Sequence, residues 1–195
     1  MIAAIILAAG AGRRIGTPKA LLRRGDETYL SRAVDVCRQA GCQTVWATTR
    51  EDLPELDEEV ARLGVVPVLN KEPEDGMFSS VKQGLIVALA EDPDSQFFVL
   101  FPVDHPEVKS ETVSLLVESL RKELAKDANA AWCRPAFEGR GGHPIVVTSD
   151  MAQALAADPD NKRPLRDALF EMAEPLTVEV DDPGVRRNVN TPEDL

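Results

Sequence analysis

The feature that most constrains this chain is a short apolar run that leads directly into a glycine-rich basic loop, LAAGAGRRIGTPK, at residues 7–19. The run covers residues 4–8 and contains only alanine, isoleucine and leucine. Such a run is typical of a strand buried on both faces of a parallel sheet, and we expect a strand over residues 2–8. The loop would then lie at the carboxyl end of that strand, where open α/β sheets bind ligands.

The loop combines backbone freedom with positive charge. Its glycines let main-chain N–H groups approach a ligand closely, and its basic side chains attract anions. The residues concerned are Gly10, Gly12, Gly16, Arg13, Arg14 and Lys19. Together they predict phosphate binding. The alternative is a plain glycine-rich turn between a strand and a helix, with solvated basic side chains.

Two common glycine loops do not fit this stretch. Its spacing is G-x-G-x-x-x-G, whereas the dinucleotide fingerprint needs G-x-G-x-x-G. A P-loop needs Lys directly after its last glycine, but Gly16 is followed by Thr17 and Pro18.

The remaining chain alternates strand and helix patterns. We expect strands at residues 44–49, 65–69, 97–101, 130–134, 145–148 and 176–180. We expect helices at residues 28–40, 51–63, 79–90, 149–157 and 164–172, and one whose apolar positions are 113, 116, 117, 120 and 124. The alternation predicts an α/β fold, a three-layer αβα sandwich with a mostly parallel, Rossmann-like sheet. Because no repeat or linker interrupts it, we expect a single domain over residues 1–195.

Composition and charge exclude several classes of protein. The formal net charge of −11 argues against general nucleic-acid binding, which rests on neutralising phosphates. No apolar run approaches the roughly 20 residues of a membrane helix, and no basic segment precedes the first run as in a secretory signal. Cys37, Cys42 and Cys133 are odd in number and lack metal or redox spacing, so we expect reduced thiols and a cytoplasmic location.

Two other segments carry candidate site residues. Residues 70–85 read NKEPEDGMFSSVKQGL, where Ser79 or Ser80 is expected to cap the following helix. In residues 101–106, FPVDHP, Asp104 comes just after an expected strand. A carboxylate there, facing a phosphate loop, suits magnesium, which prefers oxygen ligands and takes few of them from the protein. The alternative is a turn-forming Asp before His105, itself expected to pack or cap rather than catalyse.

The glycine loop resembles the signature L-A-[AG]-G-x-S-x-R-M-G-x-P-K of MobA-like nucleotidyltransferases. It matches at Leu7, Ala8, Ala9, Gly10, Arg14, Gly16, Pro18 and Lys19, and departs where Gly12 replaces Ser and Ile15 replaces Met. The family segment N-x-x-x-x-x-G-M-x-S-S-x-x-x-G-L matches at Asn70, Gly76, Met77, Ser79, Ser80, Gly84 and Leu85. Asp104 stands at the Asp of the family's D-M-P.

Two family motifs near the C-terminus match with changes. Residues 139–144, GRGGHP, resemble G-x-R-G-H-P with Gly141 in place of Arg, and Arg140 is a candidate to compensate. From the residues alone, this stretch is a hairpin-like turn with a structural His. Residues 188–195, NVNTPEDL, resemble D-x-D-T-P-E-D-L with Asn190 in place of the second Asp, although a simple helix cap at Thr191 is the alternative.

The resemblance implies the nucleotide-diphospho-sugar transferase fold and Mg²⁺-dependent nucleotidyl transfer. It implies catalytic roles for Arg14, Lys19 and Asp104, with Asp104 and Asn190 as metal ligands and Gly142 and His143 at the acceptor. The implied nucleotide-binding residues are Leu7, Ala8, Ala9, Gly10, Gly12, Gly16, Asn70, Gly76, Met77, Ser79 and Ser80. The Ala8-Ala9-Gly10 form resembles the molybdenum cofactor cytidylyltransferase (MocA-like) branch, which uses CTP, whereas the guanylyl branch usually has Ala-Gly-Gly.

Three hypotheses therefore stand. The first is transfer of CMP from CTP to molybdopterin cofactor, with a molybdoenzyme apoprotein as a further partner. The second is transfer to a sugar phosphate or another phosphorylated alcohol, which Asn190 favours. The third is a non-catalytic carrier or chaperone that hands cofactor to an apoenzyme, which the changes at Gly12, Gly141 and Asn190 keep open.

Overall fold

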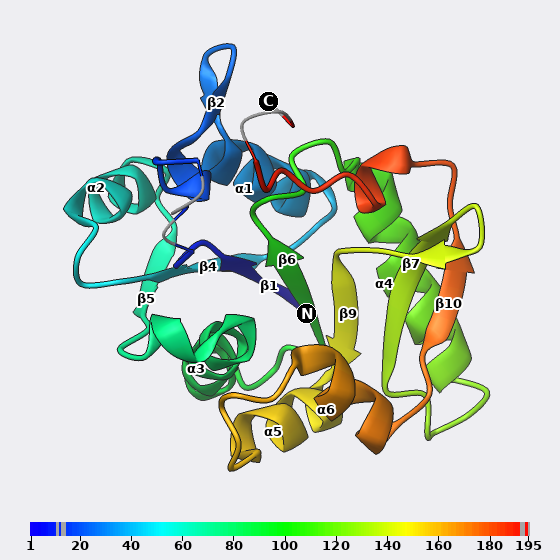
Figure 1. Ribbon diagram of the computed structural model, residues 1–195. Helices are drawn as coiled ribbons and strands as arrows, with labels where there is room; N and C mark the ends of the chain where they lie inside the picture. The colour runs from blue at the N-terminus through cyan, green and yellow to red at the C-terminus, as the bar shows by residue number, and fades with distance from the viewer. Residues whose placement is uncertain (11, 13–14, 192–193, 195) are drawn as a thin grey trace.

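The structure is a computed structural model that describes residues 1–10, 12, 15–191 and 194 (Figure 1). The sequence-predicted phosphate ligand Arg14 and its neighbour Arg13 lie outside the described residues, as do Pro192 and Glu193 of the C-terminal motif.

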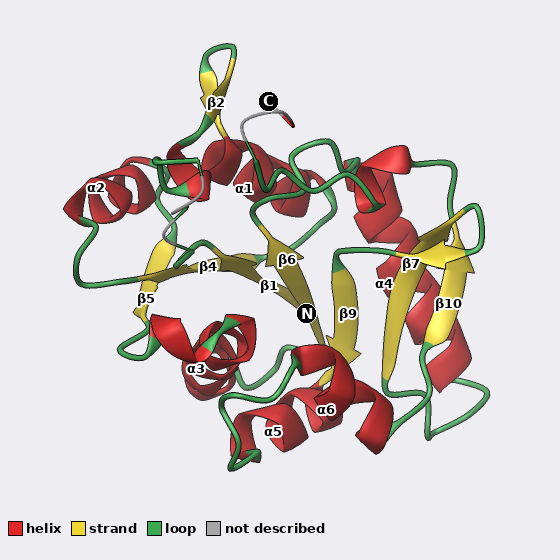
Figure 2. Ribbon diagram, viewed as in Figure 1, coloured by secondary structure: helices red, strands yellow, loops and turns green. Residues whose placement is uncertain are grey.

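The described chain alternates strands and helices around one central sheet (Figure 2). The strands of this sheet are β1 (Ile2–Leu7), β4 (Thr44–Thr49), β5 (Val66–Leu69), β6 (Phe97–Pro102), β7 (Trp132–Phe137), β8 (Arg140–Gly141), β9 (Ile145–Thr148) and β10 (Leu176–Glu179). The α-helices are α1 (Tyr29–Gln39), α2 (Pro54–Arg62), α3 (Met77–Glu91), α4 (Ser110–Leu124), α5 (Ser149–Ala157) and α6 (Leu165–Met172). A small hairpin pairs β2 (Arg23–Arg24) with β3 (Glu27–Thr28), and 3-10 turns cover Lys19–Leu21, Pro73–Asp75 and Pro183–Val185.

The strand order is β10-β7-β9-β6-β1-β4-β5, and β8 pairs with β7. Strands β1, β4, β5 and β6 run parallel, as do β7 and β10, whereas β9 runs antiparallel to both of its neighbours. The predicted mostly parallel sheet with helices on both faces is confirmed. Strand β9 is reversed because residues 138–144 form a hairpin connection, which is too short for the crossover of about a dozen residues that parallel strands need.

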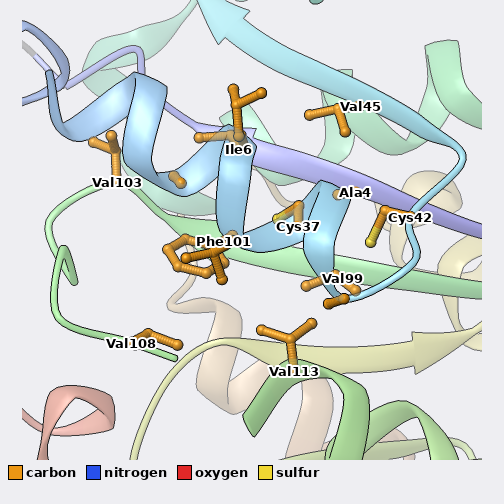
Figure 3. Packing of buried hydrophobic residues seen from close by; sticks show 14 of the residues in the cluster. Ala4, Ile6, Cys37, Cys42, Val45, Val99, Phe101, Val103, Val108 and Val113 are labelled. Carbon is orange, nitrogen blue, oxygen red and sulfur yellow. The ribbon is translucent and has the colours of Figure 1, made fainter. Parts of the chain in front are cut away.

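Alternate residues of the apolar run in β1 belong to two hydrophobic clusters on opposite faces of the sheet. On one face Ala4 and Ile6 pack with residues of α1 and α4, as Figure 3 shows, and of α2. On the other face Ile5 and Leu7 pack with residues of α3, α5 and α6. Gly84 allows α3 to approach β1 closely, because a Cβ there would lie 2.4 Å from Ile5 Cγ2. Burial on both faces explains why the run lacks polar alternation.

The expected elements match the observed ones closely, although the short strands β2, β3 and β8 were not expected and α2 begins three residues later than expected. Two further differences concern α3 and β7. Helix α3 begins at Met77, and its N-cap is Gly76 (φ +102°), which provides no side-chain cap bond. The expected cap at Ser79 or Ser80 is therefore wrong: both residues already lie within the helix, and Ser79 Oγ donates to Gly76 O instead. The strand expected at residues 130–134 is shifted, to Trp132–Phe137, where it pairs with β8, β9 and β10.

The described cysteines Cys37, Cys42 and Cys133 are all buried and free, as expected. Burial raises the pKa of the Cys133 thiol to about 12, so this thiol stays protonated. None of the helices in the described part of the chain combines the length and the hydropathy of a membrane span.

Candidate active site

Three side chains from distant parts of the chain meet beyond the carboxyl ends of β1 and β6. Lys19 Nζ donates to Asp104 Oδ2 at 2.8 Å and to Asn190 Oδ1 at 2.6 Å. The Lys19 and Asp104 side chains are only 20% and 17% exposed. Lys19 follows the loop after β1, Asp104 follows β6, and these strands are hydrogen-bonded neighbours. Because the two strands are adjacent, the loops that follow them lie together. Open α/β sheets bind ligands in such crevices beyond the carboxyl ends of their strands.

The C-terminal segment is fixed in place by its own hydrogen bonds. Val189 N donates to the backbone oxygen of Asp104 at 2.9 Å. The Asp194 carboxylate accepts from the backbone N–H groups of Asn190 and Thr191, at 2.9 and 2.8 Å, and also from Thr191 Oγ1. These bonds lower the pKa of the Asp194 carboxyl, and the bond from Asn190 N has the largest effect, ahead of the bond from Thr191 N. Asp194 thus holds Asn190 beside Asp104 and Lys19.

The oxygens of Asp104 and Asn190 converge on one positive charge, the Lys19 ammonium. One oxygen is anionic and the other is a neutral amide oxygen, and both are hard donors that suit Mg²⁺ or Mn²⁺. Among the described residues there is no cluster of three or more His, Cys, Asp or Glu side chains that could hold a metal alone. The donor set therefore fits a divalent cation that takes its other ligands from phosphate oxygens and water.

A cavity of about 240 Å³ opens beside this group, between the loop after β1 and the start of α3. Many of the sequence-predicted residues line it, namely Leu7, Ala9, Gly10, Gly12, Lys19, Gly76, Met77, Ser80 and Asp104. Of the other predicted nucleotide-binding residues, all of which are described, Ala8, Gly16, Asn70 and Ser79 are not part of this lining.

Three of those four residues, Ala8, Asn70 and Ser79, form hydrogen bonds that hold the lining segments in place. Ala8 is buried and its N–H donates to Thr48 Oγ1 at 3.0 Å, which anchors the end of β1. Asn70 is buried, and its Nδ2 donates to both Ser79 Oγ and Ser80 Oγ at 2.9 Å. These bonds tie the end of β5 to the first turn of α3 and fix the loop between them.

The backbone explains the glycine at position 12, where the family signature has Ser. Gly12 has φ +61°, and a Cβ there would lie 1.9 Å from Thr17 O. Gly12 O also accepts from Ile15 N and Gly16 N at 2.9 Å. A side chain at position 12 is therefore incompatible with this loop conformation.

Arg50 is a site residue that the sequence analysis missed. Its side chain is 8% exposed, and Nη1 donates to Ala9 O at 3.3 Å, while Nη2 bonds Asp52 at 2.9 Å and Glu74 at 3.1 Å. These bonds, with that to Asp52 the largest cause, raise the pKa of Arg50 despite its burial. Arg50 links the loop after β1 to the loop before α3, and its place directly after β4, next to β1 in the sheet, is the signal that could have identified it.

A larger cavity of about 680 Å³ adjoins the first, and Met77 lines both. The predicted acceptor residues Gly142 and His143 line this cavity together with His105. The rings of His105 and His143 lie 5.2 Å apart. Burial lowers the pKa of both imidazoles, that of His143 to about 4, so both are neutral at pH 7.

The close approach of Gly142 to Val185 shapes one wall of this cavity. A Cβ at Gly142 would lie 2.3 Å from Val185 O, and His143 N donates to that same oxygen at 2.9 Å. Further lining residues that the sequence analysis did not identify are Trp132, Arg134, Arg166, Phe170 and Arg186.

The structure thus brings the glycine-rich loop, a carboxylate and two adjoining cavities together. The chain belongs to the family of the MobA-like NTP transferase domain, whose family model matches residues 4–176. The predicted MobA-like family and the predicted α/β fold are therefore confirmed.

Individual relatives differ in what their names say. A "Probable molybdenum cofactor guanylyltransferase" of Bacillus mycoides is 27% identical over 121 residues, which cover 62% of this chain and 58% of that protein. The chain thus spans little more than half the length of this relative. A nicotine blue oxidoreductase of Paenarthrobacter nicotinovorans is 28% identical over 160 residues, 80% of this chain and 75% of that protein.

Among solved structures, Rv0371c of Mycobacterium tuberculosis matches with a TM-score of 0.71 and 25% identity, covering 99% of this chain and 94% of that chain. Rv0371c has also been solved in complex with manganese. A divalent cation is thus associated with a protein of the same fold.

Proposed function

We propose that this chain transfers a nucleoside monophosphate from a nucleoside triphosphate to a phosphorylated small molecule and releases pyrophosphate, with residues 1–195 as one nucleotidyltransferase domain. The observation that carries the proposal is the contact of Lys19 with Asp104 and Asn190 at the smaller cavity, which shares Met77 with the larger one. The smaller cavity lies against the glycine loop and suits the nucleotide. The larger suits the acceptor.

The reaction is an in-line displacement. A phosphate oxygen of the acceptor forms a bond to the α-phosphorus, and the bond from that phosphorus to the bridging oxygen breaks, so that its electron pair leaves with pyrophosphate. The acceptor phosphate is already anionic, and little acid–base chemistry is needed. Catalysis then consists of bringing two polyanions together and neutralising the developing charge.

We assign charge neutralisation at the α-phosphate to Lys19, because its ammonium lies at the junction of the loops after β1 and β6. The amides of the glycine loop, with Arg14, hold the β- and γ-phosphates. Asp104 and Asn190 would hold Mg²⁺, which supplies charge neutralisation across the phosphates. Gly76 and Met77 offer backbone groups to the base, and neutral His143 offers a hydrogen bond to the acceptor.

We further propose CTP as the nucleotide and molybdopterin cofactor as the acceptor, in a cytoplasmic setting and with a molybdoenzyme apoprotein as the recipient of the product. Ala9, the residue on which the CTP assignment rests, lines the nucleotide cavity. The name of the Bacillus mycoides relative supports a molybdenum cofactor acceptor but makes GTP the competing nucleotide.

Pyrophosphate release with each of CTP, GTP, ATP and UTP, with Mg²⁺ and with or without molybdenum-bound molybdopterin, tests this function. Release that needs both CTP and the pterin is the expected result, and Lys19→Met should abolish it. Lys126→Met is the matched control, because Lys126 is an exposed lysine paired with Glu123.

Other outcomes redirect the assignment. Release only with a sugar phosphate or another phosphorylated alcohol would replace the molybdopterin acceptor, an outcome that the neutral oxygen of Asn190 favours. Nucleotide binding without turnover across all acceptors would contradict nucleotidyl transfer and identify a carrier.

A further inference from the structure

A third cavity, of about 750 Å³, is formed by β2, the loop after β6 and the segment before the C-terminal motif. It shares no lining residue with the smaller cavity, and only Arg186 and Asn188 with the larger one. Its described lining has two carboxylates and twice as many arginines, namely Arg23, Arg24, Arg186 and Arg187. In a chain with a formal net charge of −11, such a local excess of positive charge on a concave surface attracts anions.

Glu107 lies between the two arginine pairs and bonds one member of each. Its Oε1 accepts from Arg24 Nη1 at 2.9 Å, and its Oε2 accepts from Arg187 Nη1 at 2.7 Å. The Arg24 and Arg187 side chains are nonetheless 62% and 68% exposed, and a guanidinium has further N–H donors to offer. The other carboxylate, Asp194, is occupied by the backbone N–H groups described above. The Glu107 carboxylate therefore stands where an anionic group of a ligand would bind.

The other two arginines keep their charge unpaired. Arg23 Nη2 donates to Asp26 O and Arg186 Nη1 donates to Gly141 O, both at 2.7 Å. No carboxylate in the described part of the chain forms an ion pair with either arginine. These two guanidinium groups are therefore available to a ligand without displacement of an internal anion.

A buried hydroxyl adds a neutral donor to this lining. Tyr29 lines the cavity and is only 5% exposed, and its hydroxyl has no hydrogen-bond partner among the described residues. The hydroxyl is not one of the unpartnered side-chain atoms that are shut off from solvent, so it reaches the cavity. Burial raises the pKa of Tyr29, while the nearby Arg24 lowers it and Glu107 raises it, so the phenol is a protonated donor at pH 7. A polar group this deeply buried normally finds a partner, which a ligand would supply.

We propose that this cavity is an additional anion-binding site for a small organic molecule with two or more phosphate groups, bound by the arginine pairs and the Tyr29 hydroxyl. Guanidinium groups bind phosphate oxygens in bidentate pairs, and arginines on two separate segments suit more than one phosphate. A phosphate that bridges Arg24 and Arg187 takes the place of Glu107. The cavity volume is typical of sites for small organic molecules. Because the cavity shares no residue with the smaller one, the inference does not rest on nucleotidyl transfer.

The test is calorimetric binding of fructose 1,6-bisphosphate to the full chain, without nucleotide or divalent cation. The bisphosphate should bind more tightly than fructose 6-phosphate, and uncharged fructose should not bind. Tyr29→Phe removes only the hydroxyl and should weaken bisphosphate binding about 10-fold, as should Arg187→Ala, the usual effect of losing a hydrogen bond to a charged group. Arg121→Ala is the matched control, because Arg121 is an arginine of α4 paired with Glu118, and it should leave the binding unchanged.

Glu107→Gln gives a result that a folding defect would not mimic. It removes the competing carboxylate and should tighten bisphosphate binding about 10-fold, whereas a purely structural role for Glu107 predicts weaker or unchanged binding. Lys19→Met separates this cavity from the smaller one. Binding that is lost in Lys19→Met but kept in Tyr29→Phe would place the bisphosphate in the smaller cavity and overturn the inference. No measurable binding, equal affinities for the bisphosphate and the monophosphate, or no gain in Glu107→Gln would also overturn it.

Discussion

Lys19 stands where a divalent cation would contact Asp104 and Asn190, so it should compete with that cation. Its ammonium bonds both oxygens, at 2.8 and 2.6 Å, in a site whose side chains are largely shielded from water. Metal binding in the absence of nucleotide requires that these bonds break. We therefore expect Lys19→Met to bind Mn²⁺ more tightly than the wild-type protein when no nucleotide is present.

The size of the effect follows from the bonds that are lost. A hydrogen bond to a charged group contributes about 1.5–3 kcal/mol net, and we take one such value for the two bonds together because they share a single, partly exposed ammonium. Removing the competing ammonium should therefore tighten Mn²⁺ binding by about 10- to 150-fold, at 1.4 kcal/mol for each factor of ten. A nucleotide supplies phosphates that attract Lys19 away from Asp104, so wild-type protein with a non-hydrolysable CTP analogue should also bind Mn²⁺ tightly.

Electron paramagnetic resonance of free Mn²⁺ measures these affinities without turnover. Lys126→Met is the control for loss of a lysine away from the site, and Asp104→Ala in the Lys19→Met background should remove the gained affinity. The same Mn²⁺ affinity in wild-type protein and in Lys19→Met would refute the reasoning that this ammonium occupies the metal position.

Three further predictions concern stability, measured by urea unfolding. Gly12→Ala should cost about 1–3 kcal/mol more than Gly25→Ala, because both glycines have positive φ but only the Gly12 Cβ would meet a backbone oxygen, at 1.9 Å; equal costs would contradict the loop conformation. Gly84→Ala should also cost about 1–3 kcal/mol, since its Cβ would lie 2.4 Å from Ile5 Cγ2, whereas a gain in stability would disprove this close packing. Burial lowers the pKa of His143 from 6.5 to about 4, so the unfolded chain takes up a proton first as pH falls. The contribution of neutral His143 to the free energy of unfolding should be complete above pH 6.5 and should decline by up to about 3 kcal/mol towards pH 4. A decline of the same size in the His143→Gln variant would show that His143 is not its cause.

Local patterns predicted the parts of the fold that depend on neighbouring residues. The apolar run of β1 identified a strand buried on both faces, and positions after strands identified Lys19 and Asp104 as residues at the same edge of the sheet. The residues alone also predicted the hairpin-like turn at residues 139–144, which the antiparallel pairing of β7 with β8 and β9 confirms. The strand pattern did not specify the reversed direction of β9, which follows from that short connection.

The features that sequence reasoning missed depend on three-dimensional contacts. Arg134 reaches the cavity because the register of β7 and β8 sets it beside a residue without a side chain. Arg50 joins two loops that are far apart in the chain, and its role depends on β4 lying next to β1. Neither contact leaves a periodic pattern in the sequence.

The fate of the α-phosphate tests nucleotidyl transfer most directly. CTP labelled with ³²P at the α-position is incubated with Mg²⁺ and molybdenum-bound molybdopterin, and the products are separated by chromatography. Label that moves into a pterin-containing product, in wild-type protein but not in Asp104→Ala, is the result expected. Label that stays in CTP or appears as free CMP, or equal transfer by Asp104→Ala, would contradict it.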